Sequence, residues 1–380
     1  MTLFGNSGSS FGSSNSNNTK EHTVQEVPAD TVSRLQFTGA NSQNGQFLAA
    51  TSWANDVRIW QVATQNSGGS SFGNNGNFQM ATQAKAMKNH EGPALDCCWT
   101  GDNSKLFSVG ADKKGMLWDL GADSFQQVAT HDQPITCCGY AKGNNYECMV
   151  TGSLDKTIKM WDMRQATPAK TFNCPERVYA LDLLMPIMVA VTADKKLLGY
   201  RMDNDPSEWK VFESQLKQQL RCVSIFKNKA GTEPSGFAVG SIEGRVAIHN
   251  FQPDKPVDNF TFKCHRGPSN TNSRDAQEIY PVNDIAFHPN HTGLLATTGS
   301  DGKYTFWDKD NRTKIHGAQN MNTNNDPKKS ISCCSIDHEG KIFAYSVGYD
   351  WHRGHESNDP NTKPQIVLRN VVDEFKPKSK

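Results

Sequence analysis

GSLDKTIKMWD, at residues 152–162, combines the end of one strand, a tight turn that carries Asp155, and a second strand. In the second strand Ile158 and Met160 alternate with Lys159 and Trp161, as an extended backbone requires when its two faces differ. The same spacing, an acidic residue six positions before an aromatic or similar strand residue, recurs at Asp112 and Trp118, Asp155 and Trp161, Asp194 and Tyr200, Glu243 and His249, and Asp301 and Trp307. A unit of short strands that recurs about every forty residues indicates a β-propeller.

Seven such units follow one another, at about 32–62, 89–120, 130–164, 175–203, 219–251, 280–310 and 331–369. One blade cannot bury both of its faces, so stacking supplies the core, and a closed ring removes the exposed sheet edges. We therefore predict an all-β chain whose residues 22–372 form a seven-bladed β-propeller. Residues 22–27 are predicted to add a closing strand to the blade that contains 365–372. Residues 373–380 are assigned as a basic C-terminal tail, in which 376–380 are expected to be disordered.

Residues 1–21 are a low-complexity arm of Ser, Asn and Gly that carries Phe-Gly dipeptides at 4–5 and 11–12. A segment with so few large apolar residues cannot build a core, so we predict a disordered N-terminal arm. The composition returns between 66 and 77, with Phe72-Gly73. These segments resemble the phenylalanine-glycine segments of nucleoporins; a flexible linker with incidental phenylalanines is the alternative.

The composition excludes several classes of protein. The 380 residues have a formal net charge of +1, so any basic surface must be local. The chain contains no run of eighteen apolar residues and no secretory leader, so membrane insertion and secretion are not expected. Ten cysteines occur without any C-x-x-C spacing, and six of them form the adjacent pairs Cys97-Cys98, Cys137-Cys138 and Cys333-Cys334. We expect reduced core thiols, with one member of each pair buried because neighbouring strand residues face opposite ways.

Catalytic motifs do not emerge from the sequence. It contains no nucleophile elbow, phosphate-binding loop or dinucleotide fingerprint. His352, His355, Glu356 and Asp359 share one polar loop, but they lack a metal-ligand spacing that has a mechanism. We therefore predict no enzymatic activity, no metal and no cofactor. A metal-dependent enzyme that uses this loop is kept as the alternative from another functional class.

Three Trp-Asp pairs, at 118–119, 161–162 and 307–308, make the chain resemble the WD-repeat family. The resemblance implies that each blade is pinned by a hydrogen-bonded set of His, Ser or Thr, Asp and Trp. In the third unit the matching residues are His131, Ser153, Asp155 and Trp161. In the second unit they are His90, Asp112 and Trp118, with Ala111 near the place of the serine, and Asp301 is the acidic member in the sixth.

A closer resemblance rests on SWANDVR at 52–58, GSIEGRVAIH at 240–249, NFTFKCHR at 259–266, FWDKD at 306–310 and IFAY at 342–345. Together with the Phe-Gly arm, these stretches resemble the nuclear-pore mRNA export factors, a family of propellers that bind the GLEBS motif, across nearly the whole chain. The resemblance implies a non-enzymatic adaptor that docks on the GLEBS hairpin of an FG nucleoporin and supports mRNA export from the nucleus. It also implies spindle and checkpoint roles, and a location at the nuclear envelope with shuttling to the cytoplasm.

Two other functions stay open. A sister family of mitotic checkpoint propellers binds GLEBS-like motifs in kinases, although its members lack the Phe-Gly arm. Many propellers are substrate receptors of ubiquitin ligases, and co-purification with a ligase adaptor would favour that reading.

A basic and aromatic cluster in the fifth and sixth units is the first candidate site. Phe260 and Phe262 alternate with polar residues and therefore share a face if this segment is a strand. Cations beside aromatic faces suit single-stranded nucleic acid, and they equally suit an acidic peptide. The resemblance implies a surface for RNA, or for an acidic partner, at Arg245, Phe262, Lys263, Trp307, Lys309, Arg312 and Lys314. Trp307 also occupies the blade-pinning position, where tryptophan is structural.

The second candidate site is the surface for the GLEBS hairpin, whose acidic residues require basic partners. Arg177, Arg221 and Arg245 lie near the starts or turns of successive strands, where each can present a guanidinium fork to a carboxylate. The alternative is that they pair within the chain with acids such as Glu176 and Glu243.

Overall fold

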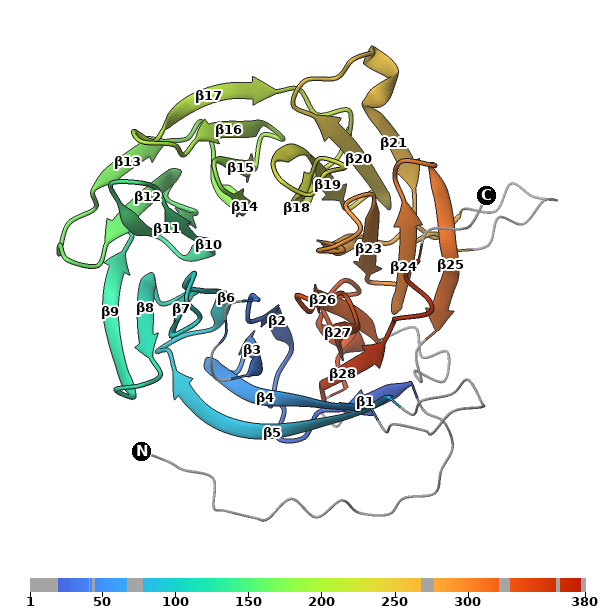
Figure 1. Ribbon diagram of the computed structural model, residues 1–380, viewed down its shortest axis with the longest axis horizontal. Helices are drawn as coiled ribbons and strands as arrows, with labels where there is room; N and C mark the ends of the chain where they lie inside the picture. The colour runs from blue at the N-terminus through green and yellow to red at the C-terminus, as the bar shows by residue number, and fades with distance from the viewer. Residues whose placement is uncertain are drawn as a thin grey trace.

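The computed structural model describes residues 20–40, 42, 45–66, 78–267, 277–320, 329–359 and 363–376. The predicted Phe-Gly arm lies almost wholly outside this range, as do Phe72-Gly73 and residues 377–380. The described strands form seven antiparallel sheets of four strands each, arranged as blades around a central opening (Figure 1). The prediction of an all-β, seven-bladed propeller is thus confirmed.

Blades 1 to 4 follow the chain order from the inner strand to the outer strand. Blade 1 contains β2 (Val32–Phe37), β3 (Gln46–Ser52), β4 (Asp56–Asn66) and β5 (Phe78–Asn89), and blade 2 contains β6 (Ala94–Trp99), β7 (Lys105–Gly110), β8 (Lys114–Asp119) and β9 (Ser124–Thr130). Blade 3 contains β10 (Ile135–Lys142), β11 (Glu147–Ser153), β12 (Thr157–Asp162) and β13 (Lys170–Asn173). Blade 4 contains β14 (Val178–Leu184), β15 (Ile187–Thr192), β16 (Leu197–Arg201) and β17 (Ser207–Phe212).

Blades 5 to 7 complete the ring. Blade 5 contains β18 (Leu220–Lys227), β19 (Pro234–Ser241), β20 (Arg245–Asn250) and β21 (Phe260–Lys263), and blade 6 contains β22 (Val282–Phe287), β23 (Leu294–Gly299), β24 (Lys303–Asp308) and β25 (Thr313–Asn320). Blade 7 contains β26 (Ser330–Ile336), β27 (Ile342–Gly348), β28 (Gln365–Asn370) and the N-terminal strand β1 (Glu21–Thr23).

The ring closes where β1 pairs antiparallel with β28, from Glu21 opposite Arg369 to Thr23 opposite Val367. Arg369 also forms ion pairs with Glu21 and Glu374, which tie the two ends of the described chain together. The closing strand is shorter than the predicted segment 22–27. The amide of Val24 still donates to the carbonyl of Ile366 at 2.9 Å, and beyond it the backbone reaches a positive φ of 55° at Glu26.

The core lies between the blades, and both members of each adjacent cysteine pair are buried in it. The prediction that only one member is buried is therefore wrong. Cys97 packs among residues of blades 1 and 2, whereas Cys98 packs with blade 3 residues. Neighbouring side chains do face opposite ways, but a strand inside the ring has a blade on each side, so both faces are core.

The expected tail from residue 373 begins with packed residues. Phe375 is 1% exposed, and its ring stacks on Phe306 in blade 6 with centroids 4.3 Å apart. Burial of the Phe375 side chain is more favourable in free energy than its exposure to water in a disordered tail. The basic residues at 378 and 380 lie outside the described residues.

Helical structure in the described residues is limited to two short turns, η1 (Pro256–Asp258) and η2 (His355–Ser357). No helix in the described part of the chain has the length and apolar character needed to cross a membrane.

Candidate partner-binding surfaces

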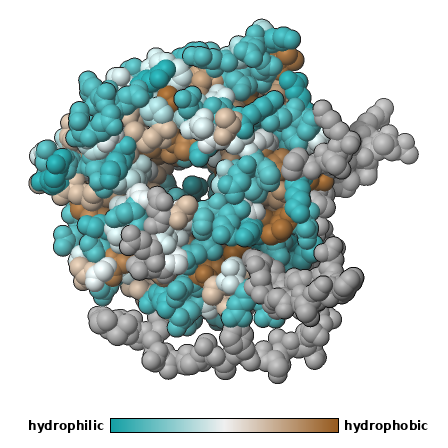
Figure 2. All heavy atoms as spheres, viewed as in Figure 1, coloured by the Kyte–Doolittle hydropathy of each residue, from teal (hydrophilic) through white to brown (hydrophobic). Residues whose placement is uncertain are grey.

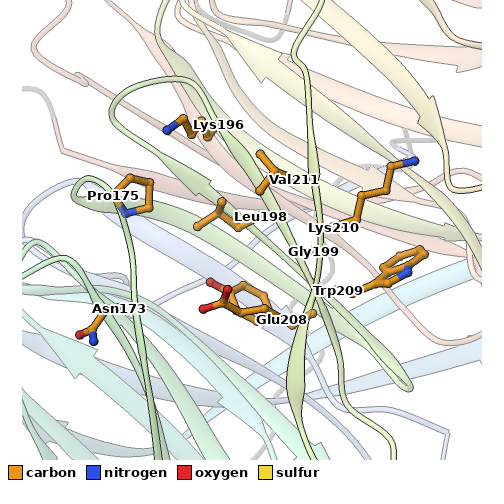
Figure 3. Close-up of a pocket in the computed structure, with 10 residues that line it drawn as sticks. Asn173, Pro175, Lys196, Leu198, Gly199, Glu208, Trp209, Lys210 and Val211 are labelled. Carbon is orange, nitrogen blue, oxygen red and sulfur yellow. The ribbon is translucent and has the colours of Figure 1, made fainter.

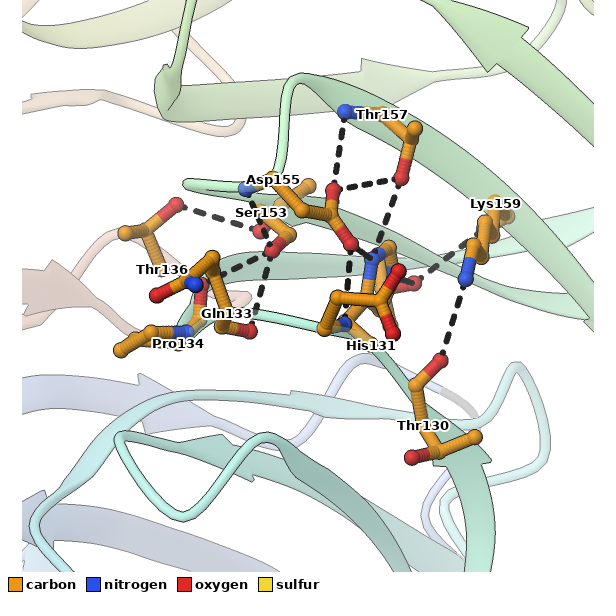
Figure 4. A network of polar contacts seen from close by, with 12 residues as sticks. Thr130, His131, Gln133, Pro134, Thr136, Ser153, Asp155, Thr157 and Lys159 are labelled. Atoms are coloured by element: carbon orange, nitrogen blue, oxygen red, sulfur yellow. Dashed lines mark hydrogen bonds and ion pairs between the residues drawn. The ribbon is translucent and has the colours of Figure 1, made fainter.

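We call the hydrogen-bonded set of side chains that pins a blade its pin. In blade 3 the pin is centred on His131, which lies under the turn between β11 and β12 (Figure 4). Its Nδ1 lies 2.8 Å from an Asp155 carboxylate oxygen, and its Nε2 lies 2.8 Å from the Thr151 hydroxyl oxygen. The same hydroxyl accepts a hydrogen bond from the Trp161 indole at 2.8 Å. Burial lowers the pKa of His131 in spite of the neighbouring Asp155 carboxylate.

Thr151, and not the expected Ser153, joins the histidine to the tryptophan in this pin. Ser153 lies at the end of β11, where its hydroxyl donates to the backbone carbonyls of Gln133 and Pro134 and accepts from the amide of Asp155. Thr151 lies within β11, two residues before Ser153, and therefore reaches the histidine and the tryptophan. Ser153 lies next to the turn and bonds to its backbone instead.

Blade 2 repeats this pattern with a different closing contact. His90 lies 2.9 Å from Asp112 and 2.8 Å from the Ser108 hydroxyl, so a serine is present three residues before Ala111. Trp118 donates instead to Asp123, at 3.4 Å.

In blade 6 the pin is complete. His265 lies 2.8 Å from Asp301 and 3.0 Å from the Thr297 hydroxyl, which accepts from Trp307 at 3.0 Å. The sequence indicates Asp301 and Trp307 but not the other two members. In the sequence, residues 266–281 stand between His265 and β22, the first strand of blade 6. The spacing between the histidine and the other members of the pin is therefore not apparent.

Part of the predicted basic and aromatic cluster does come together, around the rings of Phe260, Phe262 and Trp307. The centroids of Phe262 and Trp307 are 4.7 Å apart, and those of Phe260 and Phe262 are 6.4 Å apart. The guanidinium carbon of Arg312 lies 4.4 Å from the Phe260 ring centroid, and Arg312 donates to the carbonyl of Val257. Such close cation–aromatic contacts are favourable and also hold the guanidinium at a fixed place. We call Phe226, Phe260, Phe262, Trp307, Lys309 and Arg312 the cation–aromatic cluster.

Lys309 belongs to this cluster through blade 5. Its ammonium group lies 4.3 Å from the Phe226 ring centroid and 2.6 Å from an Asp310 carboxylate oxygen. Its side chain is only 11% exposed, so the lysine is less available to a partner than its sequence position suggests. Lys314 lies opposite Trp307 in the pairing of β24 with β25.

Arg245 and Lys263 lie away from these cations. They face each other in the pairing of β20 with β21, whereas Phe260 faces Ile248 at the other end. Three residues of extended strand separate the ends by about 10 Å. The expected set is therefore divided between the two rims of the ring. The upper rim carries the turns between the second and third strands, such as 154–156 and 242–244, and the lower rim carries the turn 309–312 and the loops 228–233 and 251–259.

The three arginines predicted to meet an acidic hairpin lie on or near the upper rim in blades 4 and 5. Arg177 lies 3.6 Å from Glu176 and stacks on Tyr179 with the guanidinium carbon 5.9 Å from the ring centroid, while Arg245 lies 3.8 Å from Glu243. Both intrachain pairings that the sequence left open are thus present. Arg221 is exposed in β18 and has no carboxylate within ion-pair distance among the described residues.

The upper rim also carries apolar side chains that sequence reasoning does not single out as functional. Trp53 is 52% exposed and Trp351 is 50% exposed, and Ile242 and Ile279 are exposed as well. All four lie in turns or loops on this rim. Exposed tryptophans in turns are the signal that could have marked this surface, since large apolar side chains left in water commonly mark a partner site.

Two hollows flank the outer strand of blade 4 and were not predicted. The first, of about 480 Å³, is lined by residues of β16 and β17 together with Asn173, Pro175 and Lys196 (Figure 3). The second, of about 440 Å³, lies on the lower rim between blades 4 and 5. Trp209 lines both hollows, and Figure 3 shows its ring on the opposite side of β17 from Glu208.

The polar loop between β27 and β28 is organised by a buried carboxylate. Asp350 accepts hydrogen bonds from Ser300 at 2.6 Å and Asn283 at 2.9 Å and lies 2.6 Å from His352 Nδ1. These contacts outweigh burial and hold the pKa of the Asp350 carboxyl well below its usual range. No group of three or more His, Cys, Asp or Glu side chains suited to a metal occurs within the described ranges.

Charged side chains of the inner strands line a hollow at the central opening. Figure 2 shows this opening from one face. Arg34 on β2 lies 3.4 Å from both Asp96 and Asp284, and Asp96 accepts hydrogen bonds from the amides of Cys97 and Cys138. Burial raises the pKa of Asp96 to about 6, although Arg34 opposes this rise. Burial likewise raises the pKa of Asp182.

Comparison with known proteins first defines the class. The family model "WD domain, G-beta repeat" matches residues 81–119, 124–162 and 276–308. A solved structure of U3-55K superposes with a TM-score of 0.69 over 92% of this chain and 98% of its own, at 14% identity, which shows the fold alone. The chain is a WD-repeat β-propeller.

Close relatives then define the family. The chain is 47% identical to Protein Rae1 of Drosophila melanogaster over 369 residues, which cover 97% of this chain and 99% of that protein. It is 47% identical to the mRNA export factor of Xenopus tropicalis, with 98% and 96% coverage, and 46% identical to that of Sus scrofa, with 99% and 97% coverage. The chain belongs to this family of mRNA export factors, which confirms the resemblance seen in the sequence.

Proposed function

We propose that this protein is a non-enzymatic adaptor that supports mRNA export from the nucleus, working at the nuclear pore. The observation that carries the proposal is the near full-length identity of 46–47% to proteins named mRNA export factor. The closed ring of blades with large exposed side chains on one rim fits an adaptor, because such a ring offers broad surfaces to partners.

The upper rim is the proposed docking surface for the GLEBS hairpin of an FG nucleoporin. Exposed Trp53 and Trp351 offer apolar contact area, and Arg177, Arg221 and Arg245 offer guanidinium groups to acidic residues of the hairpin. Arg221 is the strongest candidate of the three, since it has no acidic partner to exchange among the described residues.

The cation–aromatic cluster, together with Lys314, is the proposed contact for RNA. Aromatic rings can stack with bases, and lysine and arginine side chains can pair with phosphates. Arg312 is already held beside an aromatic ring, so little side-chain freedom is lost when a phosphate binds. Arg245 and Lys263, at the other rim, fit the hairpin better than this RNA contact.

Charge reversal tests the RNA contact. In a Lys309→Glu/Arg312→Glu variant, affinity for a single-stranded RNA should fall, and the slope of log affinity against log salt should flatten by roughly 0.7 for each phosphate that the variant no longer neutralises. The matched control is Lys142→Glu/Arg164→Glu in blade 3, where both side chains are exposed on the lower rim. An unchanged slope in the first variant, or an equal change in the control, would contradict the proposed RNA surface.

The predicted spindle and checkpoint roles remain predictions from the resemblance. A ubiquitin-ligase receptor and a checkpoint propeller that binds kinases stay alternatives, while the relatives from Xenopus tropicalis and Sus scrofa are named for mRNA export.

A further inference from the structure

The second hollow on the lower rim combines an aromatic wall with unpaired polar groups. Trp209 and Phe251 have ring centroids 5.4 Å apart, and both line the hollow of about 440 Å³. The guanidinium carbon of Arg201 lies 4.8 Å from the Trp209 ring centroid. Glu233 and Gln252 complete the polar lining, and both are exposed. A flat, polar-edged ligand of small size fits such a site.

A local irregularity of blade 4 creates this arrangement. The pairing of β16 with β17 shifts register between Gly199 and Tyr200, where Lys210 and Glu208 are the partners and Trp209 is the extra residue. A bulge of this kind redirects one side chain out of the normal alternation. Gly199 permits the close approach, because a Cβ there would lie 2.8 Å from the Phe212 ring and 3.1 Å from the carbonyl oxygen of Lys210. The ring of Trp209 is thereby placed in the wall of the hollow.

The hollow and the cation–aromatic cluster are connected by two short segments of blade 5. Phe226, which contacts Lys309, lies two residues before Asn228, a lining residue of the hollow, so their backbones are about 7 Å apart. On the other side, Val257, whose carbonyl accepts from Arg312, belongs to the same loop, 251–259, as Phe251. The same two loops of blade 5 therefore border both places.

The charges between the two places favour an anionic ligand. Arg201 lines the hollow, Lys227 ends β18, and Lys229 lies in the loop that follows. Within the described residues none of the three has a carboxylate within ion-pair distance. Glu233 is the one acidic group in the described lining of the hollow. A phosphate backbone would find three cations along this path that have no acidic partner within the described residues.

We propose that this hollow is a second RNA site, which takes one base of a single-stranded RNA whose backbone crosses the loops of blade 5 from the cation–aromatic cluster. The base stacks against Trp209, the Gln252 amide and the Glu233 carboxylate meet the polar edge of the base, and Arg201 pairs with a phosphate. This second site rests on the proposed RNA contact at the cation–aromatic cluster, because the same RNA strand would occupy both places. An apolar or acidic peptide is the other occupant that such a lining could accept.

RNA length separates the two sites. An RNA of about four nucleotides can occupy only one of them, whereas an RNA of about twelve can span both. In fluorescence anisotropy at fixed salt, Trp209→Ala should weaken binding of the longer RNA by about five- to a hundred-fold, the range expected for loss of one stacked base, and should change binding of the shorter RNA less than about twofold. Trp351→Ala, which removes a tryptophan from the upper rim, is the matched control and should change neither affinity.

Folding of the variant is checked by its thermal melt, since Trp209 also packs on Phe212 and Phe251. Where the melt is altered, Arg201→Gln decides instead, because its exposed side chain bears no core packing; it should weaken only the longer RNA. Unchanged affinity for the longer RNA in both variants, with the Lys309→Glu/Arg312→Glu effect intact, overturns the second RNA site. No RNA binding by the unaltered protein would instead overturn the proposed RNA contact itself, and the second site with it.

Discussion

Arg34 on the inner strand of blade 1 reaches Asp284 on the inner strand of blade 6, and the Nη1–Oδ1 distance is 3.4 Å. The contact joins two blades that are not neighbours, because blade 7 lies between them, so one side chain ties blade 1 to blade 6 at the central opening. Asp284 also accepts from the amide of Cys334 in blade 7. One arginine thus compensates carboxylates that hold several inner strands together.

Removal of this arginine should weaken the whole ring. In Arg34→Met, Asp96 and Asp284 lose their counter-charge, and we expect the free energy of unfolding at neutral pH to fall by about 2–3 kcal/mol, which is below the cost for fully buried pairs because Arg34 is partly exposed. Chemical denaturation measures the change. Arg164→Met, which removes an exposed ion pair with Asp162, should cost less than about 1 kcal/mol; equal losses in the two variants would contradict the role given to Arg34.

The raised pKa of Asp96 predicts a pH dependence with a definite sign. Its folded pKa of about 6 lies above the ordinary value of 3.8, so folding takes up a proton as the pH falls through this window. This group should therefore add up to about 3 kcal/mol of stability between neutral pH and pH near 4. Unfolding of the wild-type protein and of Asp96→Asn across this range isolates the contribution: the stability of the wild type relative to the variant should rise on acidification, and a constant or falling difference would refute it.

The pin of blade 3 predicts unequal costs for two neighbouring hydroxyl groups. Thr151→Val leaves the buried Nε2 of His131 and the indole N–H of Trp161 without their partner, while His131 keeps Asp155, and we expect a loss of about 2–4 kcal/mol. Ser153→Ala removes only bonds to the turn backbone and should cost about 1 kcal/mol. Thermal or chemical unfolding compares them. A larger loss in Ser153→Ala would make Ser153 the pinning hydroxyl, as the sequence spacing suggests.

Ring closure by β1 predicts that two N-terminal truncations differ. Deletion of residues 1–19 leaves the pairing of β1 with β28 in place and should leave the melting temperature nearly unchanged. Deletion of residues 1–30 also removes β1 and the buried Val24, so it exposes the edge of β28 and should lower the melting temperature by several degrees or more. The same loss in the shorter truncation would show that the closing strand is not the stabilising element.

The ring was predictable because its signal is repeated in local sequence. The spacing that ends in Trp118, Trp161 and Trp307 needs no distant contact to be recognised, and the number of units follows from counting. The cysteine pairs show the limit of this reasoning. Alternation along a strand predicted opposite directions for Cys97 and Cys98, but only the ring shows that both directions lead into core.

The sites were less predictable, since they depend on which strand ends meet. Seven residues named together as one surface include Arg245 and Arg312, which lie at opposite rims because an antiparallel strand carries its first and last residues to different ends. The hollow beside Trp209 depends on a register shift opposite Gly199, and a bulge leaves no clear mark in a single sequence. Thr151 escaped notice because Ser153 fits the spacing equally well.

The most direct test of the adaptor account is a calorimetric titration of the protein with a GLEBS hairpin peptide, repeated with Arg221→Glu and Arg245→Glu on the upper rim and with Arg164→Glu on the lower rim as the control. We predict tight binding that both upper-rim variants weaken and the control leaves unchanged. Absence of binding by a protein that still melts cooperatively would contradict the account.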